Sequence, residues 1–355
     1  MARFYPLRVA EVRRETAECV SVRFDVPEAL AATFAWRPGQ HLTLRHEVDG
    51  EELRRTYSLC SAPHEGEWRI AIKKVEGGRF STWANERLEP GMTLDVMPPM
   101  GSFVLPEDYH GKTFVAFAAG SGITPVMSMI KTALETDDTA TFTLFYGNRT
   151  TDSVIFLEEL EALKNKHLTR FALYHVLSRE HPGADLFYGR LTPEKLMAFA
   201  GRLFQPETTD AFFLCGPGDM ATALRQALVE QLEVPPARVH QELFTVPGQE
   251  TRQPKVDTSK LAASAVITAT LDGQTFDFPL SQKSETILDA ALKAGADLPF
   301  ACKGGVCCTC KARVLEGEVE MDVNYGLEPD QVEAGYVLTC QAHPLTPRVR
   351  ISFDE

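Results

Sequence analysis

The first hundred residues contain short runs in which apolar and polar positions alternate. These runs cover residues 19–26, 41–48, 67–75 and 92–99, and glycine, proline and acidic turn residues separate them. Because successive side chains of a strand point to opposite faces, this alternation is typical of strands that bury one face. We therefore predict an antiparallel β-barrel or sandwich for the first part of the chain.

A different pattern begins near Lys112. Apolar runs of strand length at 113–120, 142–148, 171–178 and 210–217 alternate with helical stretches at 126–135, 156–166, 193–203 and 220–232. Strands that are apolar throughout need cover on both faces, and parallel strands need a crossover connection. The alternation therefore predicts an α/β domain in which helices cover both faces of a parallel sheet.

The last part of the chain is set apart by a segment without hydrophobic periodicity. This segment is rich in proline, glycine and charge and predicts a linker over 246–262. Two strand patterns then flank an Asp-Gly turn at 265–280, and a helix is predicted near 286–295. The predicted domains are therefore 1–108, 109–245 and 263–355.

Composition and charge restrict the class of protein. No apolar run in the 355 residues approaches the roughly 20 residues of a membrane span, and the N-terminal stretch is charged where a signal peptide is apolar. The net charge of −13 argues against non-specific nucleic-acid binding, which needs a cationic surface. We expect a cytoplasmic protein with neither a membrane nor a nucleic acid as partner.

The acidity is concentrated near the C-terminus. From residue 263 onward, seven Lys and Arg stand against fourteen Asp and Glu, which is about half of the net charge on the last quarter of the chain. An acidic domain could be steered toward a basic partner, or its charge could serve only solubility. Charge alone leaves both interpretations open.

Four of the eight cysteines lie within nine positions of the third predicted domain. The spacing is Cys302-x4-Cys307-x2-Cys310, and 29 residues separate Cys310 from Cys340. A reducing cytoplasm disfavours disulfides, and structural zinc sites usually have two C-x2-C pairs where this chain has one. The spacing is instead that of plant-type [2Fe-2S] clusters. We favour such a cluster over zinc.

The residues between these cysteines fit a loop wrapped around a cluster. Gly304 and Gly305 supply the permissive backbone that the loop needs. Cys308 lies between two predicted ligands and cannot point the same way as both, so we interpret it as a non-ligand. The other cysteines are scattered and are predicted to be small core residues: Cys19, Cys60 and Cys215.

Two fragments of the first domain suit an aromatic cofactor that carries phosphate. Arg55 and Tyr57 share one face of a predicted strand, where a guanidinium suits a pyrophosphate and a ring suits stacking. Gly77 and Gly78 precede Ser81 at a strand-to-helix junction, where backbone N–H groups hold phosphate. Each fragment alone is weak, because such strands are more often ordinary surface strands.

Three turns in the second domain give a stronger indication. Residues 120–125, Gly-Ser-Gly-Ile-Thr-Pro, join a buried strand to a helix that has proline in its first turn. Residues 146–150 and 214–220 follow two further strands. Ligands of open α/β sheets bind at the carboxyl ends of the strands, so three such turns predict a nucleotide site there.

These motifs resemble those of a known family in their order along the chain as well as in their residues. Arg-x-Tyr-Ser at 55–58, GSGITP at 120–125, YGNRT at 146–150, CGP at 215–217 and E-x-F at 242–244 are similar to the ferredoxin-NADP reductase family. The tail resembles plant-type ferredoxins, and together the two resemblances cover nearly the whole chain. They imply an antiparallel β-barrel FAD domain, an α/β parallel-sheet NAD(P)-binding domain and an α+β ferredoxin domain of the β-grasp type.

The resemblance also implies individual roles at the flavin. It makes these residues contacts of FAD: Arg55, Tyr57, Ser58, and Ser81 with the Gly77 and Gly78 backbone. It places Thr124 near the flavin and nicotinamide, Cys215 and Gly216 beside the nicotinamide, and Glu242 and Phe244 against the isoalloxazine ring.

The remaining implied roles concern the nucleotide and the cluster. Gly120 and Gly122 would bring the backbone close to the nucleotide, and Arg149 and Arg179 are candidates for a 2′-phosphate. NADPH is therefore favoured, with NADH possible. The cluster ligands would be Cys302, Cys307, Cys310 and Cys340. Many plant-type ferredoxins have a small non-cysteine residue where this chain has Cys308, which adds a risk of oxidation or ligand exchange.

The chemistry of these carriers orders them. Nicotinamide gives up two electrons as a hydride, whereas a [2Fe-2S] cluster accepts one at a time, so we expect NADPH, FAD, cluster and external acceptor in that order. No catalytic acid or base is expected. The acceptor would be a separate oxygenase, because this chain has no carboxylate and histidine helix pattern for a diiron site.

Two alternatives stay open at this point. The chain could serve any of several multicomponent aromatic-ring oxygenases or monooxygenases, because the partner lies on another polypeptide. In another class, it could be a zinc-binding interaction protein that senses nucleotides.

Overall fold

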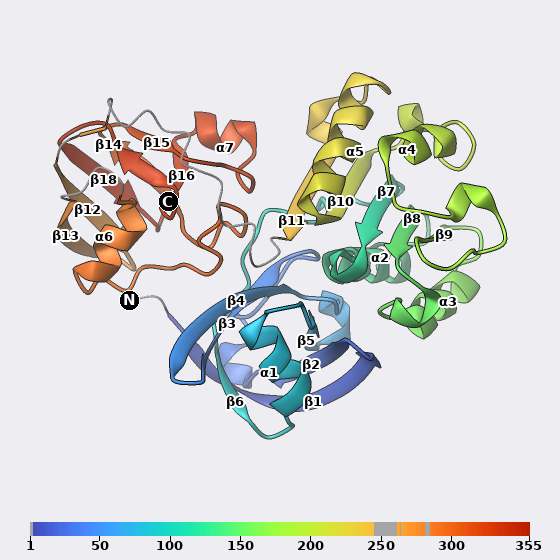
Figure 1. Cartoon of the computed structure of the whole chain (residues 1–355), viewed down its shortest axis with the longest axis horizontal. Coiled ribbons are helices and arrows are strands. Elements are labelled where there is room, and N and C mark those ends of the chain that lie inside the picture. The colour runs from blue at the N-terminus through green and yellow to red at the C-terminus, as the bar shows by residue number, and fades with distance from the viewer. Residues whose placement is uncertain (1–2, 245–260, 263, 281–284) are drawn as a thin grey trace.

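The computed structural model describes residues 3–244, 261–262, 264–280 and 285–355. Figure 1 shows three units: a barrel (blue), an α/β unit (green to yellow) and a C-terminal unit (orange to red). The predicted linker over 246–262 lies almost wholly outside the described residues, and the predicted domain limits stay predictions.

The barrel is an antiparallel sheet with strand order β4-β3-β6-β1-β2-β5. Its strands are β1 (Tyr5–Thr16), β2 (Cys19–Asp25), β3 (His41–Val48), β4 (Glu51–Ser58), β5 (Trp68–Lys73) and β6 (Thr93–Val96). The sheet closes where Leu59, directly after β4, bridges to Ile70 of β5. Helix α1 (Arg79–Arg87) packs Phe80 and Trp83 into the barrel core.

Strand β1 is absent from the alternating runs that the sequence shows. Of its 12 residues only Leu7 and Val9 are buried, so its side chains carry little periodic signal. Backbone pairing with β2 and β6 holds it in the sheet instead. Its second half is rich in charge, and Arg14 donates a hydrogen bond to Asn85 of α1.

The α/β unit contains a five-stranded sheet in the order β11-β10-β7-β8-β9. Its strands, all parallel, are β7 (Thr113–Ala119), β8 (Thr141–Asn148), β9 (Phe171–Leu177), β10 (Ala211–Pro217) and β11 (Val239–Phe244). Helices α2 (Ile123–Thr136) and α3 (Leu157–Lys166) cover one face, and α4 (Pro193–Phe199) and α5 (Gly218–Glu230) cover the other. The predicted parallel sheet between helices is confirmed.

The C-terminal unit is built on a mixed sheet in the order β13-β12-β18-β14-β16, with a separate pair β15-β17. Its strands are β12 (Ala265–Leu271), β13 (Gln274–Leu280), β14 (Lys311–Glu316), β15 (Val319–Met321), β16 (Tyr336–Leu338), β17 (Ala342–Pro344) and β18 (Arg348–Ser352). Helices α6 (Ile287–Lys293) and α7 (Pro329–Glu333) complete it.

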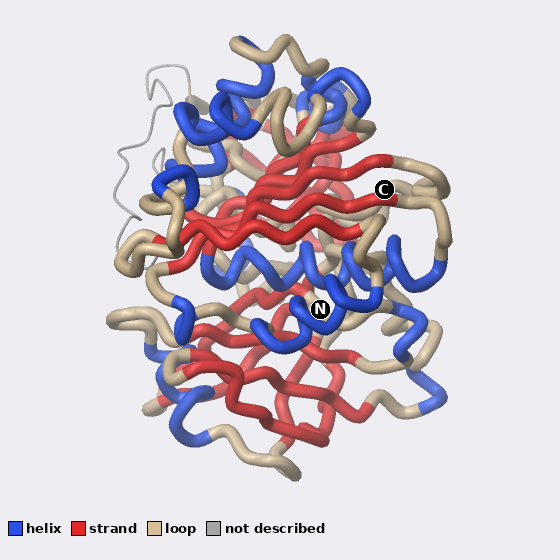
Figure 2. Tube along the Cα trace, turned by 90° about the vertical axis from the view of Figure 1, so that its right-hand side faces the viewer, coloured by secondary structure: helices blue, strands red, loops and turns tan. Residues whose placement is uncertain are grey.

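The barrel and the α/β unit share one hydrophobic core. Cys60, Phe103 and Leu105 lie in the same core as Met129 of α2 and Phe213 of β10. Figure 2 shows the resulting layers, with helices between the barrel strands and the parallel sheet. The C-terminal unit has a core of its own between its sheet and α6.

No helix among the described residues is both long enough and apolar enough to cross a membrane.

Candidate functional site

The four predicted cluster ligands lie as two pairs of thiols. The thiols of Cys302 and Cys307 interact with each other, and those of Cys310 and Cys340 do the same. In the described part of the chain, no three His, Cys, Asp or Glu side chains are grouped so that they could hold a metal ion. A [2Fe-2S] cluster takes two protein ligands on each iron, so two pairs of thiols fit this group.

N–H groups face the sulfur atoms of both pairs. The backbone N–H groups of Gly304 and Cys307 lie 3.3 and 3.5 Å from Cys302 Sγ, and Nε2 of Gln341 lies 3.6 Å from Cys340 Sγ. Hydrogen bonds from the Cys307 thiol and from the backbone lower the pKa of Cys302 below that of an ordinary thiol. Donors in these positions stabilise negative charge on cluster ligands.

Cys308 makes different contacts from the two pairs. Its backbone is left-handed, with φ of +53°. Its thiol lies 3.8 Å from the carbonyl oxygen of Val306 and so close to Gly326 that a Cβ there would collide with it. Burial raises the pKa of Cys308 to about 12, which keeps the thiol neutral. These contacts support the prediction that Cys308 is not a ligand.

A second group of polar side chains gathers where the barrel meets the α/β unit. Ser58, at the end of β4, donates a hydrogen bond of 3.3 Å to Oε2 of Glu242. Cys215 lies beside Glu242 in the β10–β11 ladder, with its Sγ 4.0 Å from the same oxygen. Nδ1 of His41 on β3 lies 3.9 Å from Oε1. Side chains of three strands therefore converge on a carboxyl group that a fourth strand carries.

Burial sets the protonation of this group. It raises the pKa of Glu242 to about 8 and lowers the pKa of His41 to about 4, because removal from water disfavours the charged form of each. The Glu242 side chain is 15% exposed and that of His41 4%. At neutral pH the carboxyl is therefore mostly protonated, and the imidazole beside it carries no charge.

The loop of residues 302–310, called the cluster loop below, lies against this group. Oγ1 of Thr309 is 3.5 Å from Oγ1 of Thr43, which lies two residues along β3 from His41. The Thr309 hydroxyl also hydrogen-bonds to Cys307. Val306 is buried in a hydrophobic core of the α/β unit that includes Leu243. All three units therefore meet at one junction.

The glycine turn at 120–125 reaches this junction from β7. A Cβ on Gly122 would lie 2.2 Å from the carbonyl oxygen of Cys215, so only glycine lets the turn touch β10. Gly216 packs closely on Ala119 of the same edge, and Thr124 is buried in the first turn of α2. The residues predicted beside the nicotinamide are thus together at the carboxyl edge of the sheet.

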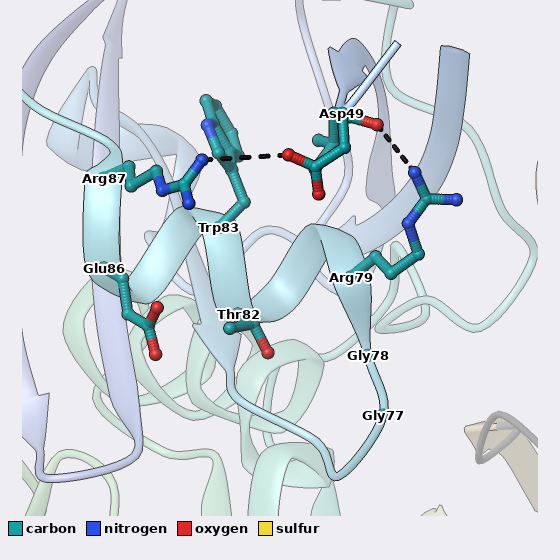
Figure 3. Close-up of a pocket in the computed structure, with 9 residues that line it drawn as sticks. Asp49, Gly77, Gly78, Arg79, Thr82, Trp83, Glu86 and Arg87 are labelled. Carbon is teal, nitrogen blue, oxygen red and sulfur yellow. Dashed lines mark hydrogen bonds and ion pairs between the residues drawn. The ribbon is translucent and has the colours of Figure 1, made fainter. Parts of the chain in front are cut away.

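The predicted pyrophosphate fragment forms the start of α1. Gly78 is the N-cap residue, and the Ser81 hydroxyl accepts from the N–H of Val75 and donates to the carbonyl of Gly78. A cavity of about 220 Å³ opens beside this turn (Figure 3) and is lined by Val48, Asp49, Gly77, Gly78, Arg79, Thr82, Trp83, Glu86 and Arg87. A helix N-terminus and two guanidinium groups suit phosphate.

The fragment on β4 presents its residues as the strand period requires. Arg55 is exposed and shares a face with Tyr57, while Arg54 is buried on the opposite face. The Tyr57 ring packs 5.8 Å from the Phe80 ring of α1, between centroids. Arg55 and Tyr57 therefore share the face toward α1, whereas Ser58 lies on the face of Arg54 and bonds to Glu242 at the junction.

Two arginines lie together at the far end of the sheet edge. The N–H of Arg179, after β9, donates to the carbonyl oxygen of Arg149, after β8, at 2.8 Å. Both side chains are exposed, and among the described residues neither forms an ion pair. Two guanidinium groups carried by neighbouring backbone segments suit a phosphate. Phe244 ends β11 and packs against the shared core.

Sequence reasoning missed His41, Thr43 and Thr309. His41 and Thr43 belong to no motif, and Thr309 is an unspecified position within the Cys307-x2-Cys310 spacing. Each reaches the junction only through the fold. The β3–β4 register pairs His41 with Ser58, which is the one signal that could have linked them. That register depends on barrel closure rather than on local pattern.

Comparisons with known proteins cover the whole chain. A model of the oxidoreductase FAD-binding domain matches residues 6–105, one of the oxidoreductase NAD-binding domain matches 117–226, and one of the 2Fe-2S iron-sulfur cluster binding domain matches 269–345. These matches confirm the predicted fold class and the predicted FAD, NAD(P)H and [2Fe-2S] cofactors. They give no support to a zinc-binding protein.

Individual relatives match over nearly their full length. The chain is 44% identical to a component of the 1,2-phenylacetyl-CoA epoxidase of Escherichia coli, over 100% of this chain and 99% of that protein. It is 38% identical to the ferredoxin reductase component of a Rhodococcus rhodochrous 3-ketosteroid-9-alpha-monooxygenase, over 98% and 96%. The structure of phthalate dioxygenase reductase has the same fold, with a TM-score of 0.60, 22% identity and coverage of 99% and 98%.

Proposed function

Because this chain belongs to the family of oxygenase reductase components that join FAD-binding, NAD-binding and 2Fe-2S domains, we propose that it supplies electrons from NADPH to a phenylacetyl-CoA epoxidase. The observation that carries the electron path is the junction itself. There Ser58 of the barrel, Glu242 of the α/β unit and, through Thr43, Thr309 of the cluster loop lie in one continuous set of contacts.

The choice of oxygenase rests on similarity rather than on the junction. The sequence segments that most favour a phenylacetyl-CoA epoxidase reductase are residues 50–58, 76–81, 287–307 and 324–342. Identity to a component of such an epoxidase is 44%, compared with 38% to the ketosteroid monooxygenase reductase. The partner we propose is therefore a separate diiron epoxidase that acts in aerobic phenylacetate degradation. A cytoplasmic location stays a prediction.

FAD, when bound, takes up a hydride and releases its electrons singly, which matches the two-electron donor to the one-electron cluster. Arg55 would balance the pyrophosphate charge, Tyr57 and Phe244 would hold the ring by stacking, and Ser58 would bond its polar edge. Gly77 and Gly78 would let a phosphate come close to the N-terminus of α1, and the hydrogen bonds of Ser81 stabilise that turn. Cys302, Cys307, Cys310 and Cys340 would hold the cluster.

Glu242 holds a proton at the junction. Its carboxyl is neutral over most of the physiological range, so it places no negative charge beside an incoming nicotinamide. Cys215, Gly216 and Thr124 shape the adjoining edge and exclude water from the transfer path. These residues position the reactants, and we assign none of them a bond-breaking role.

Arg149 and Arg179 are the basis for proposing NADPH over NADH. Replacing both with alanine removes two positive charges from the proposed 2′-phosphate contact without touching the junction. We expect KM for NADPH to rise about tenfold and that for NADH to change little. Equal changes for both nucleotides would argue against the proposal.

The test of the electron path is an anaerobic titration of the purified protein with NADPH and with NADH. Visible absorbance follows the flavin, and electron paramagnetic resonance follows the cluster. If neither nucleotide bleaches the flavin, or no reduced-cluster signal follows, the path is wrong.

The partner needs its own test. The purified chain is added, with NADPH, to a phenylacetyl-CoA epoxidase and, in parallel, to an aromatic-ring oxygenase and another multicomponent monooxygenase. Epoxide formation from phenylacetyl-CoA is the expected result. Support of a different oxygenase and not of the epoxidase would assign the chain to that system instead.

A further inference from the structure

Arg54 is a buried arginine that the electron path does not use. It lies on β4 between Leu53 and Arg55, and its side chain is 7% exposed. Its Nε donates to Glu52 at 2.9 Å within the barrel. A buried guanidinium needs partners to offset its lost hydration, and Glu52 satisfies only one of its nitrogen atoms.

The other partners of Arg54 lie in the C-terminal unit. Nη2 donates to Oδ1 of Asp297 at 3.0 Å, and the guanidinium carbon lies 4.3 Å from the centroid of the Phe300 ring. Phe300 precedes the cluster ligand Cys302 by two residues. One barrel side chain therefore binds the segment that leads directly into the cluster loop, by a charge-assisted hydrogen bond and a cation–π contact.

We propose that Arg54, with Asp297 and Phe300, is a latch that docks the C-terminal unit so that the cluster loop faces the flavin site. The proposal rests on the electron path proposed above. Few other described contacts tie the loop to the barrel, and the Thr43–Thr309 contact is long at 3.5 Å. Arg54 is thus a positioning residue for transfer from flavin to cluster, and has no part in hydride transfer.

The chemistry of the latch suits a contact that opens and closes. When the units separate, water reaches both Arg54 and Asp297, so neither charge is left buried and unpaired. The planar guanidinium and its ring partner give the contact a defined orientation when it closes. Such a pair makes docking specific without making it permanent.

Opening has a use for delivery of electrons to the oxygenase. In the docked arrangement Val306 and Thr309 are buried at the junction. An oxygenase that approaches the loop on this face meets the protein's own barrel and α/β unit first. Release of the latch exposes that face of the loop.

The test compares Arg54→Gln with a matched control, Arg45→Gln. Arg45 lies over the Phe4 ring at 4.1 Å, as Arg54 does at 5.1 Å, and pairs with Asp95, but both of these partners belong to the barrel. In anaerobic stopped-flow with NADPH, we expect Arg54→Gln to lower the rate of cluster reduction about tenfold and to leave flavin reduction unchanged. Arg45→Gln should change neither rate.

Small-angle X-ray scattering of the same proteins provides a readout that is independent of activity. The radius of gyration should increase for Arg54→Gln and stay constant for Arg45→Gln. Asp297→Asn removes the negative charge from the same contact on its more exposed side. It should reproduce both effects in weaker form, and it replaces Arg54→Gln if that variant folds poorly. The exchange of charges, Arg54→Asp with Asp297→Arg, should recover part of the cluster-reduction rate.

Two results overturn the latch. One is an unchanged cluster-reduction rate in both Arg54→Gln and Asp297→Asn, and the other is an unchanged radius of gyration in both. If the wild-type cluster itself is never reduced, the proposed function fails, and the scattering comparison still decides whether Arg54 docks the unit.

Discussion

The barrel has two interfaces, and they are built in different ways. Toward the α/β unit, Cys60 and Phe103 lie in a hydrophobic core that is continuous with α2 and the parallel sheet. Toward the C-terminal unit, the barrel offers Thr43 and Arg54, and that unit keeps a core of its own, although Val306 of the cluster loop packs into a core of the α/β unit. The first interface is part of a continuous hydrophobic core, whereas the second consists of a few polar contacts.

The difference matches what each interface has to do. Hydride transfer needs the donor and acceptor atoms at nearly van der Waals distance, so the flavin and nicotinamide sites belong on a single rigid body. Electrons pass between centres that need not touch, so the cluster can sit on a unit that separates and returns. A shared core holds the first geometry, because opening it would expose apolar surface to water.

The largest expected effect tests whether the C-terminal unit is separable in function. Cys307→Ser removes one ligand of the proposed cluster, and we expect NADPH-dependent reduction of cytochrome c to fall at least about 100-fold. Flavin reduction by NADPH should be nearly unchanged. Iron content and the reduced-cluster resonance signal report whether the cluster is lost. Cytochrome c absorbance and stopped-flow flavin absorbance measure the two rates.

Cys308→Ser is the matched control for that experiment. Its thiol bonds to the Val306 carbonyl rather than to either cysteine pair, so the variant should keep its iron and its transfer rate. Loss of flavin reduction in Cys307→Ser, or of iron in Cys308→Ser, would contradict the picture of two independent units.

The next effect tests the joined interface. Lys131 of α2 is 8% exposed and pairs with Glu65 of the barrel at 3.1 Å and with Glu159 of α3. Lys131→Met leaves Glu65 without its cation and Glu159 with only the distant Arg13 at 3.9 Å, but both carboxylates are about one-third exposed and regain water. We therefore expect a loss of about 2 kcal/mol, below the usual cost of a broken buried pair.

Denaturant unfolding measures this loss, and Lys166→Met is its control. Lys166 is 60% exposed and pairs with Glu135, so its removal should cost less than about 0.5 kcal/mol. Because the interface is shared, Lys131→Met should also slow flavin reduction. Equal stabilities of the two variants would mean that the ion pair adds nothing to the shared core.

The last effect concerns Glu242, where the two interfaces meet, and it vanishes at low pH. Its pKa is about 8 in the folded protein against an ordinary value of 4.5. Between these values the unfolded chain ionises this carboxyl and the folded chain does not, so its contribution to stability falls as pH rises from 4.5 to 8. Glu242→Gln lacks this penalty.

Thermal unfolding of the apoprotein across that range checks the sign. The Tm advantage of Glu242→Gln over wild type should be near zero at pH 4.5 and should grow steadily as the pH rises to 8. Glu107→Gln, whose carboxyl is 84% exposed, should give no such trend. An advantage that is constant with pH would rule out the raised pKa.

Local features of this protein could be predicted from its sequence alone. The spacing of Cys302, Cys307 and Cys310 predicted a cluster loop because all three predicted ligands come from one short backbone segment. The turn at 120–125 could be predicted for the same reason, since a glycine turn before a helix is recognised from neighbouring residues alone. Strand β1 was missed because burial of two of its side chains leaves no period to detect.

Contacts between segments that are far apart in the chain could not be predicted from the sequence. Ser58 and Glu242 are 184 positions apart, Arg54 and Asp297 are 243 apart, and Thr43 and Thr309 are 266 apart. Nothing in the neighbourhood of Arg54 separates it from Arg55, and only the strand period together with barrel closure turns one toward the C-terminal unit and the other away from it.

The sequence by itself therefore determined the three units and their order, and it predicted residues to hold each carrier, because periodicity, turn glycines and cysteine spacing act over a few residues. The tertiary structure decided that these sites face one another. It did so through barrel closure, the shared core and a few polar contacts between units, whose energies depend on surfaces that exist only after each unit has folded.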